Sequence, residues 1–355
     1  MLCGVALATD VSFEGTLEAD YANYLERNFT VNNAANQDLR LKMNVDLDEN
    51  VRAVVGIASV STYIGPNGAE YSRIRHRDYA TSSGSEERWS PFMFDGISIE
   101  WTVKKDLTFI FGDMFYSFGS FNYHYWRNPN YYAAVLTTQS MRGLGVRLGK
   151  DGYIYIGAPD SNGKAGRIAA SYAIPILDQA NHKFVLNPML DLNKGGGRDH
   201  NYTVGLDANY SRSYTDFNYI VRAIYGLHPS KDNYVNTFTL EPSFNYKKFS
   251  LAATCYWALL SDEDSEHDVP ITVDETYASD ERLFYLEPSY SINKHFSIGL
   301  SGEWHTPGEE DDWYLIAINN YLYPTANVNL NFWLGLSITE GPNYPSFGIS
   351  SSVKF

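Results

Sequence analysis

Residues 39–63 read LRLKMNVDLDENVRAVVGIASVSTY. From Leu39 to Leu47 apolar and polar side chains alternate, which is the period of a β-strand with a different environment on each face. The polar residues Asp48 to Asn50 then turn the chain into a second strand, from Val51 to Tyr63. The stretch therefore predicts a β-hairpin with one apolar and one polar face.

The same unit recurs along the whole chain, as alternating segments separated by clusters of turn-forming residues. The eight predicted turns are Asp48 to Asn50, Lys104 to Asp106, Gly149 to Gly152, Asp178 to Lys183, Ser211 to Asp216, Tyr246 to Lys248, Asn293 to His295 and Pro324 to Asn327. With a first strand near Val11 to Tyr24 and a last one from Phe347 to Phe355, these hairpins give eighteen strands. Sixteen is the alternative, because Pro159, Pro175 and Pro188 each remove a hydrogen-bond donor from the weakest part of the pattern.

The segments of roughly ten residues have the length of tilted strands that cross a bilayer, whereas strands of soluble sheets are mostly about five to six residues long. Long polar connections, at residues 64–93, 118–140 and 259–282, alternate with the short turns. Short turns at one end and long loops at the other are typical of membrane barrels. An open sheet edge is costly in hydrocarbon, so the first and last strands must pair. We therefore predict an all-β fold, a closed antiparallel transmembrane β-barrel, as one domain over residues 9–355.

The composition agrees with this prediction and excludes other classes. Aromatic residues make up 15% of the chain, yet no stretch approaches the ~20 apolar residues that a membrane helix needs. The net charge of −15 repels nucleic acid, so we expect no nucleic-acid partner. Cys3 and Cys255 have no companion at disulfide or metal spacing. Rings of Tyr and Trp at both rims of a barrel would explain the aromatic excess.

Residues 1–8 are small and apolar and end in a small-x-small pattern before a polar pair. They are similar to the last part of a secretory signal peptide, and we interpret them as a signal remnant outside the folded domain. A short frayed terminus is the alternative.

The chain ends in FGISSSVKF, residues 347–355, with a terminal Phe355 and apolar residues at alternate positions before it. This end resembles the C-terminal strand of Gram-negative outer-membrane barrels of the porin type, which the barrel assembly machinery reads. The resemblance implies an outer-membrane location, a periplasmic N-terminus, contacts with lipids and lipopolysaccharide, and passive diffusion of small hydrophilic solutes. It leaves open whether three copies associate as a homotrimer.

In porins the loop after the fifth strand folds into the barrel as a constriction, and here this loop is the segment 118–140. This segment lacks the acidic loop motif that is common in general porins, so we infer its inward fold from its position alone. An exposed aromatic loop is an equal alternative. The candidate constriction residues are Tyr123, Tyr125, Trp126, Arg127 and Tyr131.

Charged residues on the polar faces are candidates for lining a pore. By alternation the inward acids are Glu14, Glu18, Asp20, Glu100, Asp191, Asp207, Glu241, Glu287 and Glu303, and the inward bases are Arg40, Lys42, Arg52 and Arg147. Because the walls of a pore focus the field of such charges, and the acids outnumber the bases, this set predicts weak cation selectivity. The alternative is that these groups only pair with each other and solvate the interior.

No cofactor or metal site is expected. Acidic residues are dense from Ser261 to Glu281 and from Glu309 to Asp312, but no spacing there is typical of a calcium loop. We interpret them as solvated loops, and Ser161 to Arg167 as a turn and not a phosphate loop.

Two other functions are compatible with a barrel. One is an outer-membrane lipase or protease, for which His305 with Asp311 or Asp312 is a candidate pair, although we expect no enzyme because barrel enzymes usually have fewer strands. The other is an adhesin or receptor that acts through its long loops. Conductance would separate a pore from both.

Overall fold

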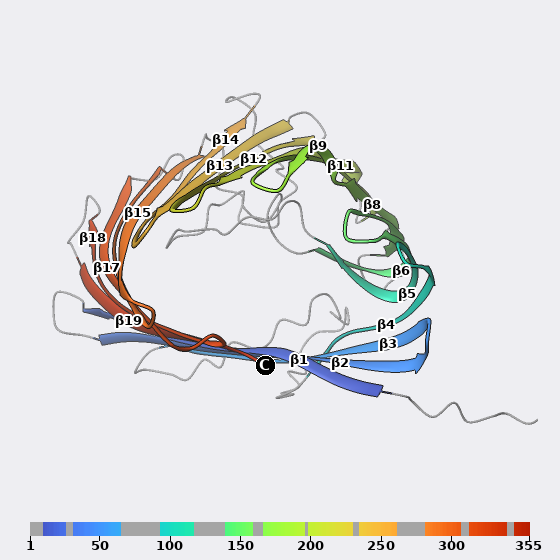
Figure 1. Ribbon diagram of the computed structural model, residues 1–355, viewed down its shortest axis with the longest axis horizontal. Coiled ribbons are helices and arrows are strands. Elements are labelled where there is room, and N and C mark those ends of the chain that lie inside the picture. The colour runs from blue at the N-terminus through green and yellow to red at the C-terminus, as the bar shows by residue number, and fades with distance from the viewer. Residues whose placement is uncertain are drawn as a thin grey trace, which may run out of the picture.

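The alternating segments form one closed β-barrel, which Figure 1 shows from one end. The computed structural model describes residues 10–25, 31–64, 93–116, 139–158, 166–195, 198–229, 234–260, 281–306, 312–338 and 344–355. The strands are β1 (Asp10–Leu25), β2 (Val31–Asp48), β3 (Val51–Ile64), β4 (Met93–Lys104), β5 (Leu107–Tyr116), β6 (Gln139–Leu148), β7 (Gly152–Ala158), β8 (Gly166–Tyr172), β9 (Ile174–Gln179), β10 (His182–Gly195), β11 (Arg198–Ser213), β12 (Phe217–Pro229), β13 (Tyr234–Tyr246), β14 (Phe249–Leu260), β15 (Glu281–Asn293), β16 (Phe296–Thr306), β17 (Trp313–Thr325), β18 (Val328–Ile338) and β19 (Tyr344–Lys354).

The first and last strands close the barrel, as the cost of an open edge in hydrocarbon requires. β1 pairs with β2 on one side and with β19 on the other, in an antiparallel register from Thr16 opposite Lys354 to Tyr24 opposite Ser346. Gly15 and Phe355 then exchange two backbone hydrogen bonds, of 2.8 Å and 3.1 Å. The prediction of a closed antiparallel barrel is confirmed.

The barrel has eighteen strands, although the described residues contain nineteen strand segments. β8 and β9 are separated only by Ala173, and both pair with β10, so together they form one strand of the wall. The pairing of β9 shifts register between Phe184 and Val185, next to the position where Pro175 offers no N–H. The region that the sequence marked as weakest is therefore an interrupted strand and not a missing pair.

All eight predicted turns are present at one end of the barrel. The short turns include Glu49–Asn50 and Lys247–Lys248, and the start of β1 and the end of β19 lie at the same end, since Asp10 is opposite Asp46 and Lys354 N donates to Asn327 O. Several strands exceed the expected ten residues: β2 has 18, and β1 and β11 have 16 each. Residues 1–9 and all but the ends of the predicted long connections lie outside the described residues.

The outer face is apolar and carries two bands of aromatic rings. Near the loop end, Phe238, Trp257, Phe284 and Trp304 form a continuous run across β13–β16, with centroids 5.1 to 5.5 Å apart. Near the turns, a second run joins Phe184, Tyr210, Tyr219, Phe217, Phe244 and Phe249. Trp257 and Phe249 are eight residues apart on β14, or ~20 Å along the axis of a strand tilted ~40°. That separation fits the apolar band of an outer-membrane barrel.

Among the described residues no helix is long and apolar enough to cross a membrane.

A charged lumen as the candidate functional site

Alternation along each strand separates a buried polar face from an exposed apolar one. On β15 the side chains of Glu281, Tyr285 and Glu287 are 1 to 5% exposed, whereas Leu286 between the last two is 50% exposed. In a closed barrel the exposed apolar face is the outer one, so the polar face lines the interior. Buried carboxylates are unusual in proteins unless other groups stabilise them. Their partners therefore determine the properties of the inner wall.

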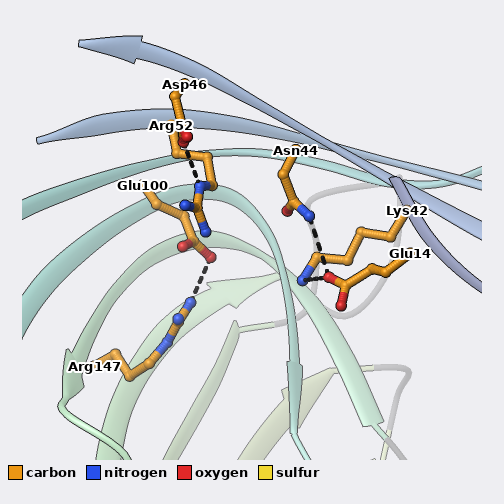
Figure 2. A network of polar contacts seen from close by, with 7 residues as sticks. All are labelled: Glu14, Lys42, Asn44, Asp46, Arg52, Glu100 and Arg147. Carbon is orange, nitrogen blue, oxygen red and sulfur yellow. Dashed lines mark hydrogen bonds and ion pairs between the residues drawn. The ribbon is translucent and has the colours of Figure 1, made fainter. Parts of the chain in front are cut away.

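On the wall of β1–β6, cations and carboxylates are paired (Figure 2). Lys42 Nζ lies 2.8 Å from Glu14 Oε1, and Asn44 Nδ2 donates to the same oxygen at 3.2 Å. Across the network, Arg147 Nη2 lies 2.5 Å from Glu100 Oε1. These two pairs bring together four of the residues predicted to point inward. Within each pair, the cation and the carboxylate neutralise each other's charge.

Arg52 extends this network toward the turns. Its Nε donates to Asp46 Oδ1 at 2.7 Å, and its backbone lies opposite Glu100 in the register of β3 and β4. A cavity of about 810 Å³ adjoins the network and is lined by Glu14, Arg40, Lys42, Arg52, Glu100 and Arg147, among others. The predicted inward bases Arg40, Lys42, Arg52 and Arg147 thus all line the same cavity.

Two further ion pairs continue around the barrel. Arg167 on β8 is paired with Asp191 on β10, which also accepts a hydrogen bond of 3.0 Å from the Tyr116 hydroxyl. Arg222 on β12 lies 3.5 Å from Glu241 on β13, the residue directly opposite it in the register. The side chains of both arginines are less than a fifth exposed. The wall therefore neutralises these arginines with adjacent acids and does not present them as a row of open cations.

Glu287 is held differently, by neutral donors. The hydroxyls of Tyr285 and Tyr321 donate to its two carboxylate oxygens at 2.6 Å each, and Asn319 Nδ2 donates at 3.3 Å. Among the residues that the structure describes, no cation lies within ion-pair distance of it. Gly299 provides the space, since a Cβ there would collide with the Glu287 carboxylate. Glu287 is thus a fixed carboxylate without a compensating charge.

The remaining predicted residues have varied positions. Asp207 and Glu303 are 5% and 3% exposed on the inner faces of β11 and β16. Arg40 lines the cavity, and Phe355 forms the closing contact with β1. The constriction candidates lie in the segment 117–138, outside the described residues, so their inward fold stays a prediction.

His305 and Asp312, a candidate catalytic pair for an enzyme, do not bind each other. His305 Nε2 instead lies 2.6 Å from Glu281, and both side chains are almost fully buried. Asp312 accepts hydrogen bonds from Thr306, Trp304 and Tyr314, which tie the ends of β16 and β17 together. The donors, first among them Thr306, hold the pKa of Asp312 below its usual value. Asp311 lies outside the described residues, and no cluster of three or more metal-ligating side chains occurs within them.

Sequence reasoning missed several inner residues. The sequence pattern predicts a turn at Arg167, but this residue is the second of β8 and is paired with Asp191 on β10. Tyr321 and Asn319 were not singled out because only the cross-strand register brings them to Glu287. Asp113 and Arg142 were also missed, and they form an ion pair on the outer face. An Asp and an Arg at apolar positions of the alternation were the available signal.

A closed antiparallel barrel with an apolar band outside and a charged interior is the architecture of outer-membrane porins as a class. The described residues of this chain have this fold. The chain resembles a BenF-like porin from Pseudomonas fluorescens Pf-5 with a TM-score of 0.60 and 10% identity, over 98% of this chain and 99% of that one.

Two other solved structures are similar over the same extent. OccK9 (OpdG) of Pseudomonas aeruginosa has a TM-score of 0.58 and 10% identity, covering 98% of this chain and 99% of that chain. OccAB4 of Acinetobacter baumannii has a TM-score of 0.57 and 8% identity, covering 99% of this chain and 100% of that chain. No known family profile and no curated protein sequence matches the chain.

Proposed function

We propose that the chain forms a passive diffusion pore for small hydrophilic solutes or ions in the bacterial outer membrane. The observation that carries this proposal is the inner wall, where ionised groups surround a cavity of about 810 Å³ inside a closed barrel. A wall of this kind favours water and hydrophilic solutes, whereas the apolar outer band favours lipid.

The orientation and partners belong to the same proposal. The short turns and both chain ends of the barrel would face the periplasm, and the loops would face lipopolysaccharide. The barrel assembly machinery would read the strand that ends at Phe355. The apolar outer wall would also allow copies to associate, as a homotrimer requires.

Permeation by neutral solutes tests the pore directly. Liposomes that contain the folded protein should swell in solutions of small sugars, and the rate should fall as the sugar becomes larger. Swelling no faster than in protein-free liposomes would contradict the proposal. Turnover on lipid or peptide would instead support the enzyme alternative, and loss of ligand binding after loop deletion would support the receptor alternative.

Weak cation selectivity is the finer part of the proposal. Lys42, Arg52 and Arg147 are paired with acids on their own wall, so they offset little of the charge of Glu287. Paired acids contribute mainly local dipoles, so the net bias should be modest. The zero-current potential across a tenfold KCl gradient should have the sign of cation preference, and an anion-preferring channel would show that the sign is wrong.

A further inference from the structure

The ladder between β4 and β5 ends halfway up the wall. The described pairing joins Ser98–Lys104 to Leu107–Gly112 only, whereas β4 continues to Met93 and β5 to Tyr116. Beyond that point β4 remains paired with β3, and β5 remains paired with β6. Figure 1 shows the same divergence, with β4 following β3 and β5 following β6. We call residues 93–97 of β4 and 113–116 of β5 the seam.

Two glycines build the divergence into the backbone. Gly112, the last paired residue of β5, has a φ of 120°, and Gly96 on β4 has a φ of 112°. Residues other than glycine rarely adopt this backbone conformation. In strands it marks a bulge or an end of pairing. The register between β3 and β4 also shifts here, between Val55 and Ile57. The ladder thus ends at a position where the sequence supplies glycine on both strands.

A side chain holds the seam at its base. The backbone N–H of Ile97 donates to Asp113 Oδ2 at 2.8 Å, in place of a carbonyl from β5. Arg142 on β6, directly opposite Asp113, binds the same carboxylate through two hydrogen bonds of 2.7 Å and 2.8 Å. The Ile97 amide is therefore satisfied by an ion pair, which we call the latch.

The latch lies on the outer face of the barrel, within the apolar band. Arg147 points into the lumen, so by alternation Arg142 points outward, beside Leu144, which is 61% exposed. Trp101 and Phe109 form an aromatic contact near the turns on this wall. Ile97 lies four residues beyond Trp101, which is ~10 Å along the barrel axis. A charged pair at that depth costs stability, and the contact that offsets the cost here is its hydrogen bond to the Ile97 amide at the seam.

The lumen cavity extends to the seam. Its lining includes Glu100 and Arg147 of the lumen network together with Gly96, Asp113 and Phe115 of the seam. Ile110 and Met114 provide an apolar surface between these two groups. One continuous space thus joins a hydrophilic interior to a break in the wall that faces hydrocarbon.

We propose that the seam is a lateral portal through which uncharged amphiphilic solutes pass between the lumen and the bilayer. The latch keeps the portal narrow. The ion pairs along the path carry no net charge, and the apolar side chains beside them suit a solute with an apolar body and one hydrogen-bonding group. This route goes beyond the axial pore of the preceding section, and ions would not use it.

The test measures entry of the uncharged dye N-phenyl-1-naphthylamine into intact cells that express the protein. In a background with Cys3 and Cys255 replaced by Ser, Gly96→Cys and Phe115→Cys place thiols across the seam, since a Cβ at Gly96 would touch the Phe115 ring. A short bis-maleimide, which adds to both thiols and joins them, should then reduce dye entry to that of cells without the protein. Single-channel conductance should stay unchanged.

A second pair of variants leaves Gly96 and Gly112 unchanged, so it tests the portal even if the cysteine variant misfolds. Asp113→Asn with Arg142→Gln removes the latch and should increase dye entry, whereas Asp178→Asn with Lys183→Gln removes an exposed ion pair at the turn between β9 and β10, outside the cavity lining, and should not. Heat-modifiable migration confirms that each variant is folded. Unchanged dye entry after cross-linking, or equal increases in both double variants, would overturn the portal. If dye entry changes as expected but the unmodified protein shows no single-channel conductance, the axial pore is overturned and the portal is not.

Discussion

Glu287 is a buried inner carboxylate and Glu100 a half-buried one, and they differ in what stabilises them. Glu100 has Arg147 at 2.5 Å, whereas Glu287 has two tyrosine hydroxyls and an amide. Hydrogen bonds from neutral groups stabilise a carboxylate without cancelling its field in the pore. Among the described residues, the charge of Glu287 is therefore not offset by a paired cation, whereas the charge of Glu100 is offset by Arg147.

Neutralising Glu287 should move selectivity toward anions. Glu287→Gln keeps the side-chain shape and removes one uncompensated charge, so the zero-current potential in a KCl gradient should shift in the anion direction. The matched control is Glu100→Gln with Arg147→Gln, which removes a pair and leaves the net charge unchanged. A shift in the control as large as that in Glu287→Gln would show that pairing does not decide selectivity.

Phe355 should matter for assembly more than an equally large side chain elsewhere. Its removal eliminates the two backbone hydrogen bonds to Gly15 that close the barrel, and it removes the terminal ring that resembles the assembly signal. Outer-membrane yield and heat-modifiable migration should both fall. Tyr214→Ala, in the turn between β11 and β12, is the control and should change neither, while normal yield without Phe355 would disprove the role of this end.

The sequence predicted which residues point inward better than it predicted which of them meet. Alternation depends only on local backbone geometry, so it identified Glu241, Glu287 and Glu303 on the inner face. Which residues meet depends on the register between neighbouring strands. A shift of one residue in that register changes every cross-strand partner. The contacts of Arg167 with Asp191 and of Tyr321 with Glu287 therefore required the structure, as did the latch on the outer face.

At the scale of elements, the hairpins were predictable because each is specified by its own short turn and by alternation on either side. The interrupted strand of β8 and β9 was the exception. Prolines weakened its pattern, and only its shared partner β10 shows that the two segments form one strand. The seam was also hidden, because the end of a ladder depends on both strands together.

The turn between β13 and β14 contains a strained residue. Lys247 has a φ of 54°, in the left-handed region that favours glycine. Lys247→Gly should stabilise the folded barrel by about 1 kcal/mol, since it relieves that strain. Urea titration of the barrel in lipid vesicles measures the change. Lys248→Gly is the matched control, with the same loss of charge and no strain to relieve, and equal stabilisation by both would show that charge and not conformation is responsible.

At the scale of the whole molecule, closure and separation of the two faces belong together. A closed ladder satisfies the backbone within hydrocarbon, which leaves the outer side chains free to be apolar and the inner ones to be charged. The 10% identity to the BenF-like porin, at a TM-score of 0.60 over nearly the whole chain, shows how loosely this fold constrains sequence. Period and turn spacing carry the fold, whereas individual inner residues determine what crosses it.

Single-channel recording of the purified, folded protein in a planar bilayer shows whether the lumen is an open diffusion pore. A closed barrel with an open charged lumen should insert in discrete steps, each adding a constant conductance that rises with KCl concentration. Protein with normal heat-modifiable migration that inserts without producing conductance steps would contradict the account of the lumen as a diffusion pore.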